Sequence, residues 1–211
     1  MYKVFFNNRI VYLADNYKTN FSKFDGLFYK YNNKDDFEKF WEFFEVISGN
    51  VKNLFIINGN VENLKQDFFS FFTVVDAAGG VVTNSKGQLL IMKRFGKWDL
   101  PKGKVTKNED FQTTALREIT EETGISELKV IKQLNTTYHT YYLNNQQILK
   151  QTHWFDMIHT GHEPFKPQIE EDITDIKWFE PKDVPIILDN TYKSIVDVLI
   201  DAGKLRLEDP G

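Results

Sequence analysis

The chain has 211 residues, a formal net charge of −4 at pH 7 and no cysteine. The lack of cysteine excludes disulfides, thiol catalysis and iron–sulfur clusters, and an acidic chain without a basic tract disfavours nonspecific nucleic-acid binding. Residues 1–15 lack the apolar core of a signal peptide and no run approaches the length of a membrane span, so we expect a cytoplasmic protein.

Residues 1–72 are predicted to form a small aromatic-rich module with the order ββαβα. In chain order we expect a hairpin over residues 1–13 that turns at Asn7-Asn8, a short strand near residues 27–31, a helix over residues 35–48 that ends at Gly49, a buried strand over residues 52–57, and a second helix capped by Asn60. The aromatic stripes of both helices are typical of a hydrophobic core. No motif in this module indicates a catalytic or binding function.

Residues 73–205 are predicted to form a second domain. Apolar patterning predicts strands over residues 73–83, 88–94, 128–135, 137–143, 148–159 and 175–179, and a closing helix over residues 190–202. The run Ala77-Ala78-Gly79-Gly80 leaves room for something close to the first strand, whereas residues 100–104 are expected to break regular structure. Strands before and after a central helix predict an α/β fold in which a mixed sheet lies between helices.

The central helix is expected to start after a cap at Asn108 and to end at Gly124, which can adopt a left-handed conformation. One face carries apolar residues at helical spacing, and the opposite face carries Glu118, Glu121 and Glu122. Each like-charge pair costs roughly 0.2 to 0.5 kcal/mol on an exposed helix. A divalent cation would convert this repulsion into ligation, and carboxylate oxygens suit Mg²⁺ or Mn²⁺. The alternative is an ordinary surface helix with ion pairs such as Arg117 to Glu121.

The segment from Gly103 to Ile125 resembles the signature of the Nudix hydrolases, GX5EX7REUXEEXGU with U aliphatic. The matching positions are Gly103, Glu109, Arg117, Glu118, Ile119, Glu121, Glu122, Gly124 and Ile125, with every spacing kept. The resemblance implies an α/β/α sandwich and a pyrophosphohydrolase that cuts a diphosphate linked to another moiety with the help of Mg²⁺ or Mn²⁺. It also implies that Glu118 and Glu122 are metal ligands and that Glu121 is a third ligand or the base that activates water.

Other candidate site residues lie on both sides of the signature. The resemblance implies that Arg117 pairs with Glu109 to fix the helix against its loop, and that Glu171 is a later carboxylate near the metal, with a solvated acidic loop as the alternative. Phosphate contacts are expected from Arg94 and Lys102 and, with solvated surface lysine as the alternative, from Lys104. Tyr138 can stack on a nucleobase or lie in the core.

The run WDLPKGKV, residues 98–105, is similar to Nudix proteins that act on dinucleoside polyphosphates, diphosphoinositol polyphosphates or oxidised nucleoside triphosphates. We therefore expect a dinucleoside polyphosphate or a nucleoside triphosphate, modified or not, as the substrate, with ADP-ribose or a nucleotide sugar as the alternative. A non-catalytic nucleotide sensor on the same scaffold is the alternative from another class. The expected partner is a small-molecule phosphoanhydride, not nucleic acid or a membrane, and a homodimer stays open.

Overall fold

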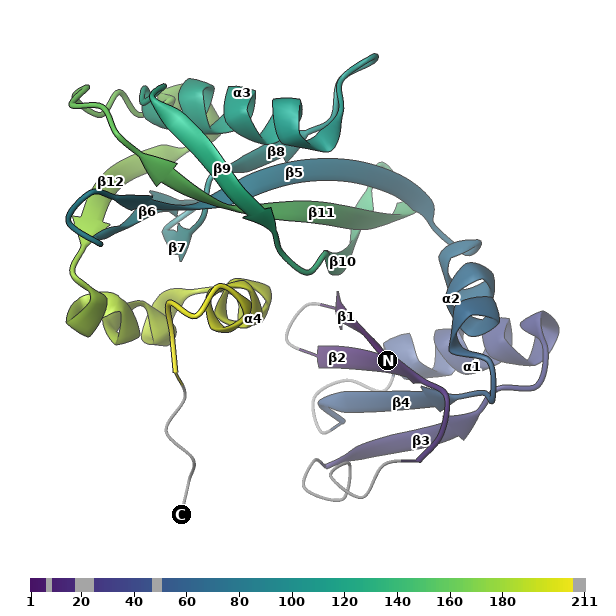
Figure 1. Cartoon of the computed structure of the whole chain (residues 1–211). Helices are drawn as coiled ribbons and strands as arrows, with labels where there is room; N and C mark the ends of the chain where they lie inside the picture. The colour runs from purple at the N-terminus through teal and green to yellow at the C-terminus, as the bar shows by residue number, and fades with distance from the viewer. Residues whose placement is uncertain (7–8, 18–24, 47–50, 207–211) are drawn as a thin grey trace. The chain divides into compact units, whose positions relative to one another are not determined.

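A computed structural model describes residues 1–6, 9–17, 25–46 and 51–206 (Figure 1). The chain divides into two compact units. Unit 1 comprises Met1–Val75 and Tyr138–Lys150, and unit 2 comprises Asp76–Thr137 and Gln151–Gly211. The segment 138–150 therefore does not share a unit with the rest of the expected second domain. The reason is a strand pairing inside unit 1, because β10 (Thr137–Leu143) pairs in parallel with β1 (Tyr2–Phe6).

Unit 1 is a sheet with two helices that pack on one of its faces. Strand β2 (Arg9–Ala14) is antiparallel to β1 and parallel to β4 (Asn53–Ile57), and β4 is parallel to β3 (Gly26–Lys30). The order is thus βββαβα and not the expected ββαβα, because the short strand near residues 27–31 completes a parallel pair. The turn at Asn7-Asn8 and the helix end at Gly49 lie outside the described residues.

The aromatic stripes of unit 1 form its core, as predicted. Helices α1 (Lys34–Val46) and α2 (Val61–Phe69) bury their apolar faces against the inner residues of the strands. Phe37, Phe44 and Phe68 are almost completely inaccessible to solvent. Helix α2 has the predicted cap, since the side chain of Asn60 accepts a hydrogen bond of 3.1 Å from the Asn63 amide.

Unit 2 is built around a sheet whose neighbouring strands are, in order, β12 (Ile173–Phe179), β6 (Leu89–Arg94), β5 (Thr73–Asn84) and β11 (Gln146–His159). Strand β9 (Leu128–Gln133) extends this sheet beside β11. Unit 2 contains antiparallel pairs, such as β6 with β12, and unit 1 contains parallel pairs, such as β2 with β4, so the chain as a whole has the mixed pairing expected of an α/β protein.

Helices cover both faces of the unit 2 sheet (Figure 1). Successive side chains of a strand point to opposite faces, and the two hydrophobic clusters of unit 2 follow this alternation. Helix α3 (Phe111–Thr123) packs against one face of the sheet, which carries Ala78, Val82, Leu90 and Met92. The 3₁₀ segment η3 (Pro181–Asn190) and helix α4 (Lys193–Asp201) pack against the other face, which carries Val81, Leu89 and Ile91. This is the expected α/β/α sandwich.

Residues 100–104 are not irregular throughout, contrary to the sequence-based expectation. Strand β7 (Lys97–Asp99) pairs with β6, and strand β8 (Lys102–Lys104) pairs with the small residues of β5, Gly103 lying opposite Ala78. A Cβ atom on Gly79 would lie 2.4 Å from the Pro101 carbonyl oxygen. The small residues of β5 therefore make room for the loop that precedes α3, as their size predicts.

No helix within residues 1–6, 9–17, 25–46 and 51–206 is long and apolar enough to cross a membrane.

Candidate active site

Helix α3, which carries the three glutamates, has a defined cap at each end and one buried face. Its N-cap is Asp110, not the predicted Asn108, because Asp110 has an extended backbone and its carboxylate accepts a 2.7 Å hydrogen bond from the Thr113 amide. Gly124 ends the helix with φ of +83°, as its position predicts. Ala115 and Ile119 are buried against the sheet, so the opposite face of α3 faces the loop that contains β8.

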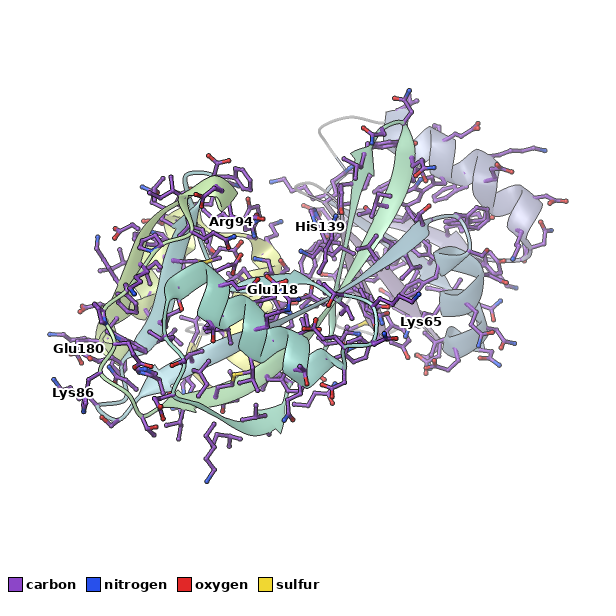
Figure 2. All side chains as sticks on the ribbon, turned by 90° about the horizontal axis from the view of Figure 1, so that it is seen from above. Lys65, Lys86, Arg94, Glu118, His139 and Glu180 are labelled. Carbon is purple, nitrogen blue, oxygen red and sulfur yellow. The ribbon has the colours of Figure 1, made fainter. Side chains whose placement is uncertain are left out.

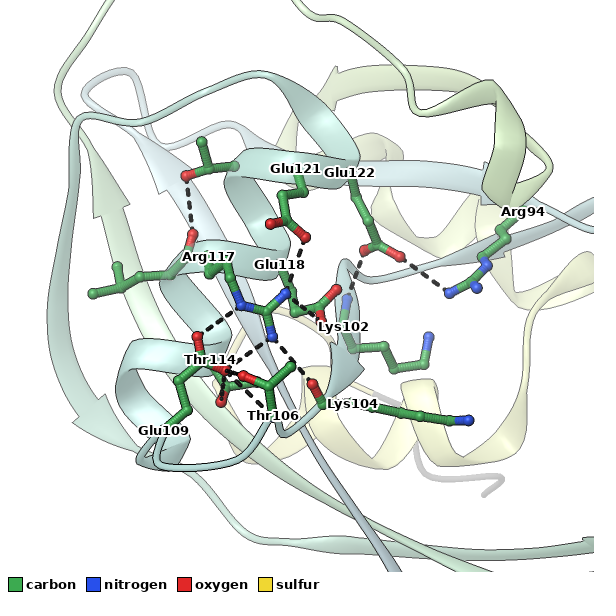
Figure 3. A network of polar contacts seen from close by, with 12 residues as sticks. Arg94, Lys102, Lys104, Thr106, Glu109, Thr114, Arg117, Glu118, Glu121 and Glu122 are labelled. Carbon is green, nitrogen blue, oxygen red and sulfur yellow. Dashed lines mark hydrogen bonds and ion pairs between the residues drawn. The ribbon is translucent and has the colours of Figure 1, made fainter.

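Arg117 joins this loop to the helix through several hydrogen bonds (Figure 3). Its Nε and Nη2 atoms donate to the two carboxylate oxygens of Glu109 over 2.7 and 3.0 Å. Nη1 donates to Glu118 over 2.8 Å and to Glu121 over 2.9 Å, and Nη2 also donates to the carbonyl oxygen of Lys104 over 3.1 Å. Such forked contacts fix the position of a planar guanidinium. Arg117 thereby holds two of the three glutamates and the loop in one arrangement.

The Arg117–Glu109 pair predicts a pH dependence of stability. Hydrogen bonds from Arg117 lower the pKa of Glu109 from 4.5 to about 2. A carboxyl group whose folded-state pKa is lowered stabilises the fold fully above its ordinary pKa and loses that contribution as the pH falls toward the folded value. We expect Glu109→Gln to lower Tm near neutral pH and this difference to shrink between about 4.5 and about 2. Thermal unfolding of both proteins over this range measures it, and a constant difference would contradict it.

Glu122 is buried beneath the loop, with only 2% of its surface exposed. Its Oε2 accepts a 2.8 Å hydrogen bond from the Lys102 amide, and its Oε1 accepts one of 3.0 Å from Arg94. Burial raises the pKa of Glu122 to about 7, against the lowering effect of Lys102 and Arg94. A further cation beside Glu122 would therefore stabilise the charged form of this carboxyl group.

Glu118 lies against the backbone of Gly103. A Cβ atom added to Gly103 would lie only 1.9 Å from Glu118 Oε2, so the absence of a side chain at residue 103 makes room for this carboxylate. Burial is the main cause that raises the pKa of Glu118, and Arg117 opposes it. Glu121 is different because half of its side chain is exposed.

Arg94 connects the helix to the later carboxylate predicted at residue 171. Its Nη2 contacts the Glu171 carboxylate, and its Nε donates to the Glu171 carbonyl oxygen over 3.1 Å. Arg94 and Glu118 lie in the same region of unit 2 (Figures 2 and 3). Arg94, Glu122 and Glu171, which are widely separated in the sequence, therefore form one connected group.

Of the two predicted lysines, one lies in this group and the other faces outward. Lys102 Nζ lies 2.5 Å from the carboxylate of Asp99 and donates to the Leu100 carbonyl oxygen. Asp99 was not among the predicted site residues; it is buried, and only its i, i+3 spacing to Lys102 could have indicated it. The side chain of Lys104 extends away from the carboxylates, while its carbonyl oxygen binds Arg117 (Figure 3).

Tyr138 does not join this group of residues. It belongs to unit 1, where only 7% of its surface is exposed and its ring packs against Tyr2 and Phe69. Its position in the strand directs the ring into the unit 1 core, which was the alternative to base stacking. The stacking role predicted for Tyr138 therefore has no support from its surroundings.

The chemistry of the donor set fits a hard divalent cation. Glu118, Glu121 and Glu122 offer oxygen ligands, and the two that are buried or partly buried have raised pKa values. Among the described residues, no three His, Cys, Asp or Glu side chains are gathered closely enough to hold one ion. Each of the three carboxylates instead accepts a hydrogen bond from Arg117 or Arg94. A bound cation would have to take over at least some of these contacts.

Comparison with known proteins finds matches over the part of the chain that contains α3 and the candidate active site. A family model described as the NUDIX domain matches residues 73–199. An RNA pyrophosphohydrolase from Pelagibacter ubique is 37% identical over 62 residues, which cover 28% of this chain and 39% of that protein. The chain thus spans about two fifths of the length of this relative.

A second RNA pyrophosphohydrolase, from Novosphingobium aromaticivorans, is 24% identical over 157 residues, which cover 64% of this chain and 98% of that protein. Among solved structures, the chain is similar to an Ap4A hydrolase from C. elegans in a binary complex, with 23% identity and a TM-score of 0.48. This similarity covers 61% of this chain and 95% of that one.

Proposed function

The chain belongs to the Nudix family, and we propose that it is a pyrophosphohydrolase that cleaves a phosphoanhydride bond in a nucleotide. The observation that carries the proposal is the arrangement of Glu118 and Glu122 on α3, directly beside the Gly103 backbone and the Lys102 amide. Carboxylates shielded from water in this arrangement can hold a cation. The adjacent loop can then contact a phosphate group that binds this cation. An ordinary ion-paired surface helix does not need a buried glutamate.

The reaction needs metal ligands, a proton acceptor and phosphate-binding cations, and different side chains of the site supply them. Nudix hydrolases generally require a divalent metal, and we propose Mg²⁺ or Mn²⁺ held by Glu118 and Glu122, with Glu121 as a third ligand or as the base that activates water. The ion would supply charge neutralisation and a water molecule of lowered pKa. Glu121 and Glu171, each about half exposed, are the carboxylates able to accept the proton of the attacking water. Arg94 and Lys102 would bind phosphate oxygens once substrate displaces their present carboxylate contacts.

The proposed substrate is a dinucleoside polyphosphate or a nucleoside triphosphate. The run WDLPKGKV supports this choice through its similarity to Nudix proteins that act on such compounds, and it lies at the site, because the Lys102 amide donates to Glu122. The names of two relatives, both RNA pyrophosphohydrolases, favour the 5′-phosphoanhydride of an RNA as a second candidate. The negative net charge of the chain disfavours binding along an RNA backbone, so an RNA would be bound chiefly at its end.

A substrate panel in the presence of Mg²⁺ or Mn²⁺ tests the proposal. The panel comprises diadenosine tetraphosphate, nucleoside triphosphates, a 5′-triphosphorylated RNA, ADP-ribose and a nucleotide sugar, with products identified by chromatography. We expect metal-dependent release of a nucleoside mono- or diphosphate from the first two classes. Turnover of ADP-ribose or nucleotide sugars alone would contradict the substrate class. Nucleotide binding with no turnover of any compound would indicate a sensor and contradict the enzyme.

A further inference from the structure

The turn between β6 and β7 has an unusual residue at its first position. Phe95 and Gly96 are its two central residues, since Arg94 pairs with Lys97, and their φ values are +49° and +74°. Positive φ at both positions is the pattern of a type I′ turn, which prefers Asn-Gly and disfavours bulky side chains. The hairpin between β10 and β11 follows this rule, with Asn144 and Asn145 at φ of +49° and +61°. Backbone conformation therefore does not explain a phenylalanine at residue 95.

Burial does not explain it either. Phe95 is 63% exposed, whereas Trp98 of the following strand β7 packs against the hydrophobic cluster on the α4 side of the sheet. The turn itself is held in place, because Gly96 accepts a 2.7 Å hydrogen bond from the Asn190 side chain. The Phe95 amide donates to the Asp172 carbonyl oxygen over 3.3 Å. A fixed turn thus presents an apolar ring to solvent. This goes against the preference of the turn for Asn at this position and against the tendency of apolar side chains to be buried.

The ring stands beside the candidate active site. The Arg94 guanidinium lies 5.3 Å from the centroid of the Phe95 ring, close enough for a cation–π contact. The same guanidinium donates to Glu122 over 3.0 Å and contacts Glu171. A single side chain therefore separates the exposed ring from two of the carboxylates proposed to act on a phosphoanhydride.

We propose that Phe95 is the stacking surface for the nucleobase of the substrate and is thereby a specificity-determining residue. The inference rests on the proposed function, because it assigns the base end of a nucleotide whose phosphates lie at Arg94 and the α3 carboxylates. An aromatic face accepts any base, so Phe95 selects nucleotides over phosphoanhydrides that lack a base and does not distinguish one base from another. The strained backbone at residue 95 is then tolerated because the ring is needed at this place.

The test uses the full chain with Mg²⁺ and two probes, a nonhydrolysable methylene analogue of ATP and inorganic tripolyphosphate, whose Kd values are measured by calorimetry. Phe95→Asn installs the preferred turn residue and removes the ring. We expect it to raise Tm by about 2 to 4 °C, because it relieves the backbone strain. We also expect it to weaken binding of the ATP analogue roughly 5-fold or more and to leave tripolyphosphate binding unchanged.

Two further variants sharpen the result. Phe95→Trp keeps an aromatic face and is expected to retain the wild-type Kd for the ATP analogue. Phe43→Ala, which removes an exposed ring from α1 in unit 1, is the matched control and is expected to change neither Kd.

Distinct outcomes would overturn the stacking assignment and the proposed function. If the wild-type chain binds both probes and Phe95→Asn binds them equally well, the stacking assignment is wrong while the function stands. A fall in Tm that accompanies weaker binding of both probes would assign Phe95 a structural role and also overturn it. A wild-type chain that binds neither probe would contradict the proposed function, and the stacking assignment with it.

Discussion

Replacing Glu122 with glutamine is expected to lower turnover at least about 100-fold, since even partners of metal ligands cost 10- to 100-fold when changed. The neutral amide keeps the shape of the side chain and removes the charge that would bind the cation. It also removes the cost of a buried carboxylate whose pKa is raised to about 7. One of the donors, Arg94 or the Lys102 amide, would meet the new amide NH₂ group and lose its acceptor. We expect these two effects on the stability of the metal-free protein to offset each other.

Two measurements separate this expectation from simple unfolding. In the wild type, Mn²⁺ is expected to raise Tm, because it binds only the folded chain, and in Glu122→Gln this rise should be absent. Glu42→Gln, an exposed glutamate on α1, is the control and is expected to keep both turnover and the Mn²⁺-dependent rise. Full activity of Glu122→Gln would show that this carboxylate is not a ligand of the metal.

Gly103→Ala is expected to cost about 100-fold in turnover while the fold is retained. A Cβ atom at residue 103 would overlap the Glu118 carboxylate at 1.9 Å. The carboxylate is the end of a flexible side chain, so it can turn away at small cost to stability. A displacement of a ligand by about 1 Å is enough for a loss of about 100-fold in rate. Steady-state kinetics and thermal unfolding of the same preparation measure the two effects.

Gly79→Ala is the matched comparison for this substitution. A Cβ atom at Gly79 would lie 2.4 Å from the Pro101 carbonyl oxygen, which is backbone and cannot turn away. We therefore expect Gly79→Ala to lower stability by more than 1 kcal/mol, whereas Gly103→Ala should change it by less. Equal losses of stability in the two variants would contradict the inference that Glu118 alone yields to the added methyl group.

The N-terminal unit shows how far local patterns predict tertiary structure. The aromatic spacing in residues 35–48 predicted a helix with a buried stripe; the structure has helix α1 over Lys34–Val46, and its Phe37 and Phe44 lie in the core. The strand near residues 27–31 was expected, but its contribution to the module was not, because parallel pairing with β4 joins segments that no local pattern links. The assignment of residues 138–150 to unit 1 has the same cause, since β10 pairs with β1 across more than a hundred residues of sequence.

The glutamate face of α3 follows from the amino-acid order alone, since helical periodicity places Glu118, Glu121 and Glu122 together whatever surrounds them. The end of α3 at Gly124 is equally local, because the left-handed conformation that closes the helix favours glycine there. Three relations could not be read from local patterns. Glu122 is buried against Lys102 and Arg94, and Asp99 forms an ion pair with Lys102. Tyr138 belongs to unit 1 and not to the unit of the site. Those relations depend on pairing between distant strands, and burial and pKa follow from what that pairing brings into contact.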